Sequence, residues 1–301
     1  MSLMLGTKTT IVVSSPDMAK EFFHTNDQSF SGRFITEAIR AEDHYKFSIV
    51  WLPVGDQWRR LRRITKEYLL SVQCLVNSYA ERSTVMNSTD EKAVNVGATT
   101  FTTILNILST LIFSLDFSQY DYVSSQEFKE SVWALLEYGG KPNLADFFLI
   151  LKPLDPQGIA RRESVHMKKL LTIFDKLIEQ RLQTRLSSSS YDGVSSTDND
   201  VLNLLLNLKQ KDEFEFSQNQ LGHLFMDLFV AGTDTTSSTI EWAMSELIRN
   251  PDKMAIARSE LVKLMQYNNR RDMRAEDMDM EEKFGITLQK NVPLMAIPIK
   301  L

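Results

Sequence analysis

The residues best suited to proton transfer lie in a run of small and hydroxyl-bearing residues, LFVAGTDTTSST, from Leu228 to Thr239. Ala231 and Gly232 would let a flat or bulky ligand approach the backbone of a buried helix. Asp234 and Thr235 follow within one turn. A Thr hydroxyl can donate to the carbonyl four residues back and open the helix groove for a water, so Asp234 and Thr235 would relay protons to a ligand over Gly232. The alternative is a hydroxyl-rich kink where another helix packs closely.

A second pair of residues has the chemistry to bind an anion. Trp58 and Arg62 are four residues apart in the segment WRRLR, so they share one face of a predicted helix. There an indole N–H and a guanidinium can jointly hold a carboxylate. The same spacing is also typical of a cation–π pair on a core face.

The helix that must position the first run is predicted from Ser217 to Arg249. Ser217 and Gln220 form a capping box, and Asn250-Pro251 ends this helix and begins the next. At 1.5 Å per residue such a helix is roughly 50 Å long, which is enough to cross a whole domain. It is therefore expected to be the central element of the fold.

The rest of the chain is predicted to be mainly α with small β elements. Leu3 to Val13 is typical of a β element with a tight turn, and Ser15-Pro16-Asp17 is a helix start. Ser187 to Asp200 is a low-complexity loop, and Phe284 to Leu301 is typical of a terminal hairpin. Helices are expected at 55–72, 75–87, 93–115, 124–138, 156–186, 198–210, 217–249 and 251–266.

Composition and charge exclude several classes of protein. With 43% hydrophobic and 24% charged residues, the 301-residue chain is neither disordered nor fibrous. The 34 basic and 39 acidic residues form no basic stripe, so no nucleic-acid partner is expected. The single cysteine, Cys74, excludes an internal disulfide framework. The uncharged stretch from Ala93 to Leu115 is long enough to cross a bilayer, but nine of its residues are Asn, Ser or Thr, which favours a buried helix.

Taken together, the two motifs resemble the cytochrome P450 superfamily. Trp58-x-x-x-Arg62 is followed far downstream by Ala231-Gly232-x-Asp234-Thr235-Thr236. The segment DLFVAGTDTTSSTIEWAMSELIRNP is similar to the plant microsomal branch that oxidises terpenoids, the geraniol 8-hydroxylase-like group. The likeness extends over almost the whole chain, through KFSIVWLPVGDQWRRLRR (46–63), GKPNLADFF (140–148), DPQGI (155–159) and MDMEEKFGITLQKNVPL (278–294).

The resemblance implies a single P450-like domain over residues 1–301 that contains haem b. It implies hydroxylation of a small apolar, terpenoid substrate with NADPH and O2, with electrons supplied by NADPH-cytochrome P450 reductase. The implied site residues are Trp58 and Arg62 for a haem propionate, Ala231 and Gly232 against the porphyrin, and Asp234 with Thr235 for proton delivery during dioxygen activation.

The same resemblance implies where a substrate would lie. The segments Thr36–Pro53 and Glu137–Phe148 would face it. Phe225, Phe229 and Ala231 would line the pocket from the central helix. The alternative for these apolar residues is that they belong to the ordinary core.

The chain departs from the family at the ligand of the haem iron. The family uses a cysteine thiolate in a Phe-x-x-Gly-x-Arg-x-Cys-x-Gly loop, and this sequence contains no such loop. Glu37–Arg40 and Glu246–Arg249 match the family's Glu-x-x-Arg pattern only outside its usual helix, and a Pro-Glu-Arg-Phe-type segment is absent. We therefore expect an incomplete P450-like fold with an internal deletion near 267–275, and we assign no metal ligand.

Two further expectations concern location and substitute ligands. The family is found at the endoplasmic reticulum membrane on the cytoplasmic face, and the sequence contains no N-terminal anchor, which leaves the location cytoplasmic or unknown. The four histidines, His24, His44, His166 and His223, have no paired metal spacing, and His44 is the least implausible substitute ligand.

The sequence therefore predicts a P450-type monooxygenase lineage in which this chain is catalytically impaired or inactive. Two alternatives remain, which are a non-catalytic truncated product and a binding protein that uses the residual scaffold.

Overall fold

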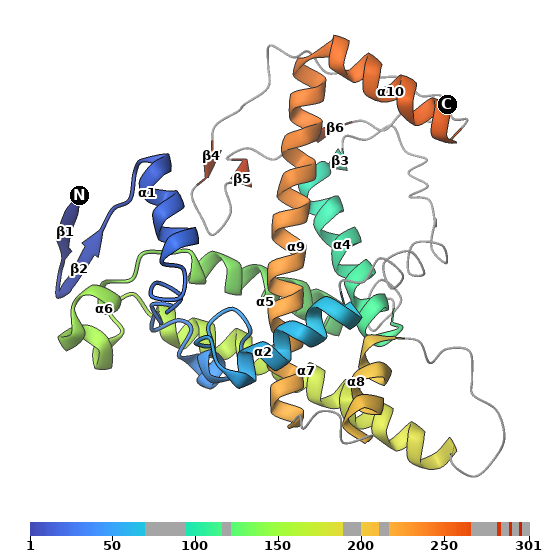
Figure 1. The fold of residues 1–301 in the computed structure, drawn as a ribbon. Helices are drawn as coiled ribbons and strands as arrows, with labels where there is room; N and C mark the ends of the chain where they lie inside the picture. Colours follow the sequence, from blue (N-terminus) through green and yellow to red (C-terminus); the bar gives the residue numbers. More distant parts are fainter. Residues whose placement is uncertain are drawn as a thin grey trace.

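The long helix predicted from Ser217 is the central element of the computed structural model. The structure describes residues 1–69, 94–115, 122–188, 200–210 and 217–265, together with 282–283, 289–290 and 295–296. Helix α9 extends over Gln218–Arg249, with Asn250 as its C-cap. Both hydrogen bonds of the predicted capping box are present, between Ser217 and Gln220. Figure 1 shows α9 spanning most of the molecule.

Helices α4 (Val96–Phe113), α5 (Tyr122–Gly139) and α7 (Ile159–Ser188) make most of the helix packing on α9. Helix α4 lies alongside it, whereas α5 and α7 run across it (Figure 1). Where the helices meet, five phenylalanines from all four helices are at most 1% exposed, with ring centroids 5.0 to 6.1 Å apart. These rings are Phe113, Phe128, Phe174, Phe225 and Phe229. This aromatic cluster holds the N-terminal half of α9 in place, and more residues are exposed in the C-terminal half.

The predicted β element at the N-terminus is confirmed. Strands β1 (Ser2–Leu5) and β2 (Lys8–Ile11) pair antiparallel, with Leu5 opposite Lys8. Gly6 has a φ of +62°, and a Cβ there would meet the carbonyl oxygen of Phe147, so the turn requires glycine. The backbone N–H of Thr7 donates to the same oxygen at 2.8 Å. The hairpin is thereby attached to helix α6 (Leu144–Phe147).

The shorter elements connect these parts. Ser15 caps α1 (Pro16–Lys20) as predicted, but a π turn (Glu21–Thr25) follows at once. The remaining elements are the 3-10 helix η2 (Ala41–Lys46), α2 (Asp56–Ile64), the π turn η3 (Thr65–Leu69), the 3-10 helix η4 (Leu149–Leu154), α8 (Val201–Gln210) and α10 (Pro251–Met265).

The C-terminal strands pair differently from the predicted terminal hairpin. Strand β4 (Glu282–Lys283) pairs with β5 (Gln289–Lys290), and β6 (Met295–Ala296) pairs with β3 (Val94–Asn95), 200 residues or more away in sequence. The predicted helix at 75–87, Cys74 and the expected deletion near 267–275 lie outside the described residues.

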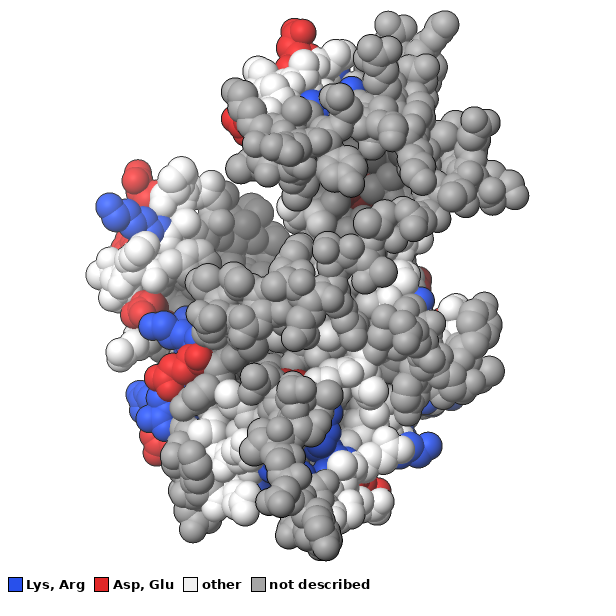
Figure 2. Space-filling view, turned by 90° about the vertical axis from the view of Figure 1, so that its right-hand side faces the viewer, with Lys and Arg blue, Asp and Glu red and all other residues white. Residues whose placement is uncertain are grey.

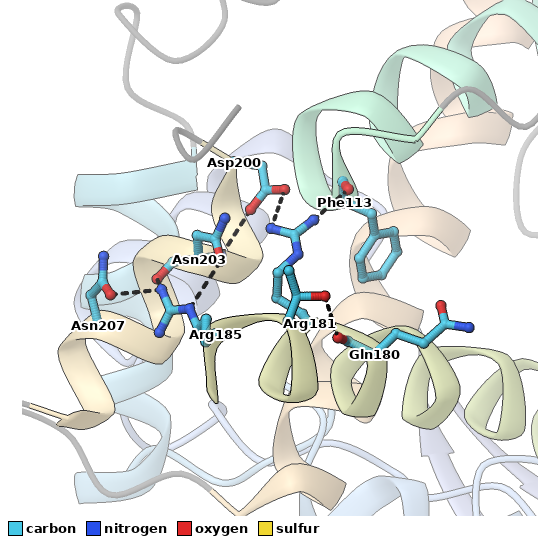
Figure 3. A network of polar contacts seen from close by, with 8 residues as sticks. Phe113, Gln180, Arg181, Arg185, Asp200, Asn203 and Asn207 are labelled. Carbon is cyan, nitrogen blue, oxygen red and sulfur yellow. Dashed lines mark hydrogen bonds and ion pairs between the residues drawn. The ribbon is translucent and has the colours of Figure 1, made fainter. Parts of the chain in front are cut away.

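Two arginines of α7 hold three helix ends together (Figure 3). Arg181 forms an ion pair with Asp200 at 2.7 Å and donates to the carbonyl of Phe113 at the end of α4. Asp200 also caps α8, since it accepts the N–H of Asn203. Arg185 donates to the side chain and the carbonyl of Asn203. These contacts position α4, and α4 in turn supports α9.

Helix α4 is long and apolar enough to cross a membrane by length and composition. A third of the tested window is buried, and the buried residues Phe101, Leu105, Ser109, Ile112 and Phe113 lie on one side. Helix α4 packs against α9. On the face drawn in Figure 2, the basic and acidic side chains of the described residues are interspersed.

Candidate functional site

The predicted proton-transfer run lies on α9, where one face is exposed and the other is buried. Ala231, Thr235, Thr236 and Thr239 are exposed. Ala231, Thr235 and Thr239 recur at the helical spacing of four residues and Thr236 is adjacent to this row, so the four form one continuous face. The residues of the opposite face are buried and include Thr233, Asp234, Ser237, Ser238 and Glu241. The open face carries small side chains and hydroxyls, and it is accessible over about two turns.

The hydroxyls of this run donate to the helix's own carbonyls, as the sequence predicted. Thr235 donates to the carbonyl of Ala231 at 2.6 Å, and Thr236 donates to that of Gly232 at 2.8 Å. Each hydroxyl oxygen keeps lone pairs that can accept a hydrogen bond from a water. The exposed Thr235 hydroxyl is therefore held in one orientation and can still bind a water.

Gly232 serves the packing of α9 on α4. A Cβ at this position would lie 3.2 Å from Cδ1 of Leu108. Ala231, in contrast, is exposed. The close helix packing that the sequence left as an alternative is present at Gly232, and the exposed surface lies on the side of Ala231.

The predicted pair Asp234 and Thr235 is divided between the two faces. Asp234 is 2% exposed, whereas Thr235 is exposed. Successive residues of a helix differ by about 100° in direction, which accounts for the division. Asp234 therefore lies on the buried side of α9, and Thr235 lies on the open face.

Trp58 and Arg62 share one face of α2, and the guanidinium carbon of Arg62 lies 5.3 Å from the Trp58 ring centroid. The indole N–H of Trp58 donates to the carbonyl of Ile49 at 3.1 Å. Arg62 is exposed. The cation–π pairing left open by the sequence is therefore present, and it leaves the guanidinium edge available to an anion.

The two segments predicted to face a substrate lie together. The N–H of Glu37 donates to the carboxylate of Asp146 at 2.7 Å, and Lys152 forms an ion pair with Glu37 at 2.6 Å. Burial raises the pKa of Asp146. Contacts between residues 109 positions apart thus join the segments Thr36–Pro53 and Glu137–Phe148.

Phe225 and Phe229 lie in the aromatic cluster rather than at an open surface. Both are fully buried. Phe229 contacts Phe128 with ring centroids 5.0 Å apart, and Phe225 contacts Phe113 at the same distance. Their environment is that of the ordinary core, which is the alternative stated for them.

Sequence reasoning missed one polar cluster, formed by His44, His223 and Asp227. Nδ1 of His44 lies 2.8 Å from Nδ1 of His223, and Nε2 of His44 lies 3.2 Å from the Asp227 carboxylate. All three are at most 7% exposed. The two histidines are 179 residues apart. The available signal was the spacing of His223 and Asp227, which are four residues apart on one helix face.

Among the described residues no group of three or more His, Cys, Asp or Glu could hold a metal ion.

The described residues fit one side of a haem site. Arg62 presents an exposed guanidinium that suits a carboxylate, and the open face of α9 would admit a flat ring beside Ala231. The described residues include no thiol, because the single cysteine, Cys74, lies outside them. The described residues would therefore supply an anion-binding guanidinium and an open helix face to a haem.

Comparisons with known proteins show which family the chain is similar to. Residues 1–281 match the family described as Cytochrome P450. The chain is 47% identical over 270 residues to cytochrome P450 76T24 of Catharanthus roseus, covering 87% of this chain and 53% of that protein. It is 43% identical over 274 residues to geraniol 8-hydroxylase of the same plant, covering 88% and 54%. It is 42% identical over 273 residues to a protein of Beta vulgaris named inactive cytochrome P450 76AD1, covering 88% and 64%.

The chain spans about half the length of the first two of these relatives. The family match nevertheless covers most of the chain and includes α2 and α9, on which the two motifs lie. The chain belongs to the cytochrome P450 family.

Proposed function

We propose that this chain carries the substrate-side half of a haem monooxygenase site for a small apolar, terpenoid substrate. The observation that carries the proposal is the exposed, hydroxyl-lined face of α9 at Ala231 and Thr235 in a chain of this family. Haem, when bound with a thiolate ligand, would supply the activation of dioxygen. By the family's pattern, electrons would come from NADPH through a reductase.

The residues of this chain would bind the ring and move protons. Arg62 would hold a propionate with its guanidinium edge, while Trp58 supports the guanidinium with its ring face. The Thr235 hydroxyl, fixed by its bond to Ala231, would hold a water over the open face. Asp234 would exchange protons with that water from the buried side of the helix.

We propose further that the 301-residue chain is impaired in turnover. Its only cysteine is Cys74, and the family's cysteine loop does not occur in the sequence. The internal deletion expected near 267–275 is part of this proposal. Sequencing of the transcript against its genomic locus tests it, because a locus that encodes no cysteine loop after Gln266 would contradict a deletion.

A chimera tests the function itself. Residues 1–265 of this chain would be joined to the remainder of the Catharanthus geraniol 8-hydroxylase, of which this chain spans 54%. We expect the chimera to retain haem, and we expect Arg62→Ala to weaken that retention about tenfold or more, since a charge-assisted hydrogen bond contributes about 1.5 to 3 kcal/mol. Arg60→Ala is the matched control, because Arg60 is exposed on the same helix.

The same chimera tests whether the hydroxyl of Thr235 or that of Thr236 couples electron consumption to product formation. Thr235→Ala is expected to lower product formed per electron consumed, with substrate affinity unchanged within about twofold, because the hydroxyl positions a water and not the substrate. Thr236→Ala is the matched control, since it removes the same group one residue later. If Thr236→Ala lowered the yield and Thr235→Ala did not, the assignment of Thr235 would be wrong.

A further inference from the structure

The His44–His223–Asp227 cluster joins the segment before α2 to the N-terminal third of α9. Asp227 lies on α9 and accepts two hydrogen bonds from this segment, from the Ser48 hydroxyl at 2.7 Å and from the Ile49 N–H at 2.8 Å. Its carboxylate also lies 3.2 Å from Nε2 of His44. Ile49 in turn accepts the indole N–H of Trp58. A single carboxylate on α9 therefore determines where the Ile49 peptide lies, and through it the orientation of Trp58.

The contacts fix which nitrogen of each imidazole carries a proton. Nε2 of His44 faces a carboxylate that can only accept, so it must be protonated. In a neutral His44, Nδ1 is then an acceptor, and the facing Nδ1 of His223 must be the donor. Nε2 of His223 is left as a lone pair, and this buried atom has no hydrogen-bond partner. The chain of donors runs from His223 to His44 to Asp227.

The cluster can accept one additional proton but not two. With one more proton, His44 is a cation that donates from both nitrogens, and His223 accepts at Nδ1 and carries its proton on Nε2. With a second proton, two N–H groups would face each other across 2.8 Å, and two cations would lie side by side in a buried site. The contact between the two imidazoles cannot persist in that state.

The surroundings keep His223 neutral. Burial, followed by the neighbouring His44, lowers the pKa of His223 to about 4. Asp227 on α9 and the carboxylates of Glu42 and Asp43 on η2 act in the opposite direction. Glu42 is itself engaged by Ser164 and Lys168 of α7. The ring of Phe47 stacks on His223 at 5.0 Å, so the imidazole is shielded on that side.

We propose that His44, His223 and Asp227 are positioning residues that anchor the segment from His44 to Trp58 on α9, and that the anchor releases when both imidazoles are protonated. The inference goes beyond the proposed function, since the anchored segment is the one expected to face the substrate and the cluster itself binds neither haem nor substrate. Its test needs no cofactor, so its failure would leave the proposed function untouched.

The first measurement is the tautomer of each imidazole in the 301-residue chain. The ring nitrogens would be labelled with ¹⁵N and their couplings recorded at pH 7.5, with the four histidines assigned by single His→Gln variants. We expect His223 to be protonated on Nδ1 alone and His44 on Nε2 alone. The exposed His24 is the internal control. Protonation of His223 on Nε2 at this pH would overturn the proposal.

The second measurement is amide hydrogen exchange of residues 44–58 as a function of pH. After correction for intrinsic exchange, we expect protection of these residues to fall tenfold or more between pH 6 and pH 3.5, while the buried part of α7 around Phe174 stays protected. His223→Asn is the matched variant, since its side-chain amide keeps a donor near Nδ1 and cannot become a cation. The variant should retain protection at pH 3.5. An equal fall in both proteins, or no fall in the wild type, would overturn the proposal.

Discussion

Thr235 donates its hydroxyl to the carbonyl of Ala231 at 2.6 Å, and both residues lie on the exposed face of α9. The bond holds the hydroxyl against the helix, so the side chain leaves the face open. Two turns of such residues give the central helix one surface that is poor in apolar contacts and rich in hydroxyls. The proposed substrate-side half of the haem site depends on this surface.

Breaking the ion pair between Arg181 and Asp200 is expected to be strongly destabilising, because it leaves a buried charge without a counter-charge. Asp200 is buried, so Arg181→Ala would leave a buried carboxylate without its partner and the Phe113 carbonyl without a donor. We expect the free energy of unfolding to fall by about 3 to 5 kcal/mol in urea titrations. Arg249→Ala, which removes an exposed pair with Glu246, should cost at most about 1 kcal/mol. Equal losses for the two variants would contradict the role given to the buried pair.

Glu163 should make the protein less stable as pH rises. Burial raises its pKa to about 9, and one carboxylate oxygen has no hydrogen-bond partner. The folded state therefore binds a proton that the unfolded state has released, so stability is greatest below about pH 4.5 and falls toward pH 9. Glu163→Gln should raise the free energy of unfolding at pH 7 by about 3 kcal/mol and leave it nearly unchanged at pH 4. A stability difference that does not change between these pH values would refute the assignment.

Gly97 permits the close approach of α4 to Glu241 of α9. A Cβ at this position would lie 2.5 Å from a carboxylate oxygen of Glu241, which is buried. We expect Gly97→Ala to cost about 1 to 3 kcal/mol despite alanine's better helix propensity. Gly32→Ala, with nothing within 4 Å, is the control and should change stability by at most about 0.5 kcal/mol.

A double variant checks the cause of that loss. In Gly97→Ala/Glu241→Ala the clash is removed, so the combined loss should be smaller than the sum of the two single losses. Additive losses in a thermal-unfolding cycle would mean that Glu241 is not the group displaced.

The local features of the fold could be predicted from the sequence, and the long-range contacts could not. The start of α9 follows from a capping box within four residues, and the back-bonds of Thr235 and Thr236 follow from helix geometry alone. The pairing of β6 with β3 and the contact of His44 with His223 join residues 179 or more positions apart. No periodicity or spacing in the chain encodes such contacts, since they depend on how the helices pack.

For the candidate site as well, the local spacing of residues could be predicted and the contacts between distant segments could not. Trp58 and Arg62 share a helix face because they are four residues apart, and this was predictable. The acceptor of the Trp58 indole, the carbonyl of Ile49, depends on a turn that Asp227 fixes from α9. The division of Asp234 and Thr235 between a buried and an open face became visible only once α4 was packed on α9.

The carbon monoxide difference spectrum shows whether a thiolate of this chain binds haem iron. The purified 301-residue chain and the chimera with the geraniol 8-hydroxylase remainder would each be supplied with haemin, reduced and exposed to CO. We expect a thiolate-type Soret band for the chimera and none for the 301-residue chain, because Cys74 lies outside any loop of the family's ligand pattern. A thiolate-type band in the 301-residue chain that disappears in Cys74→Ser would contradict this expectation.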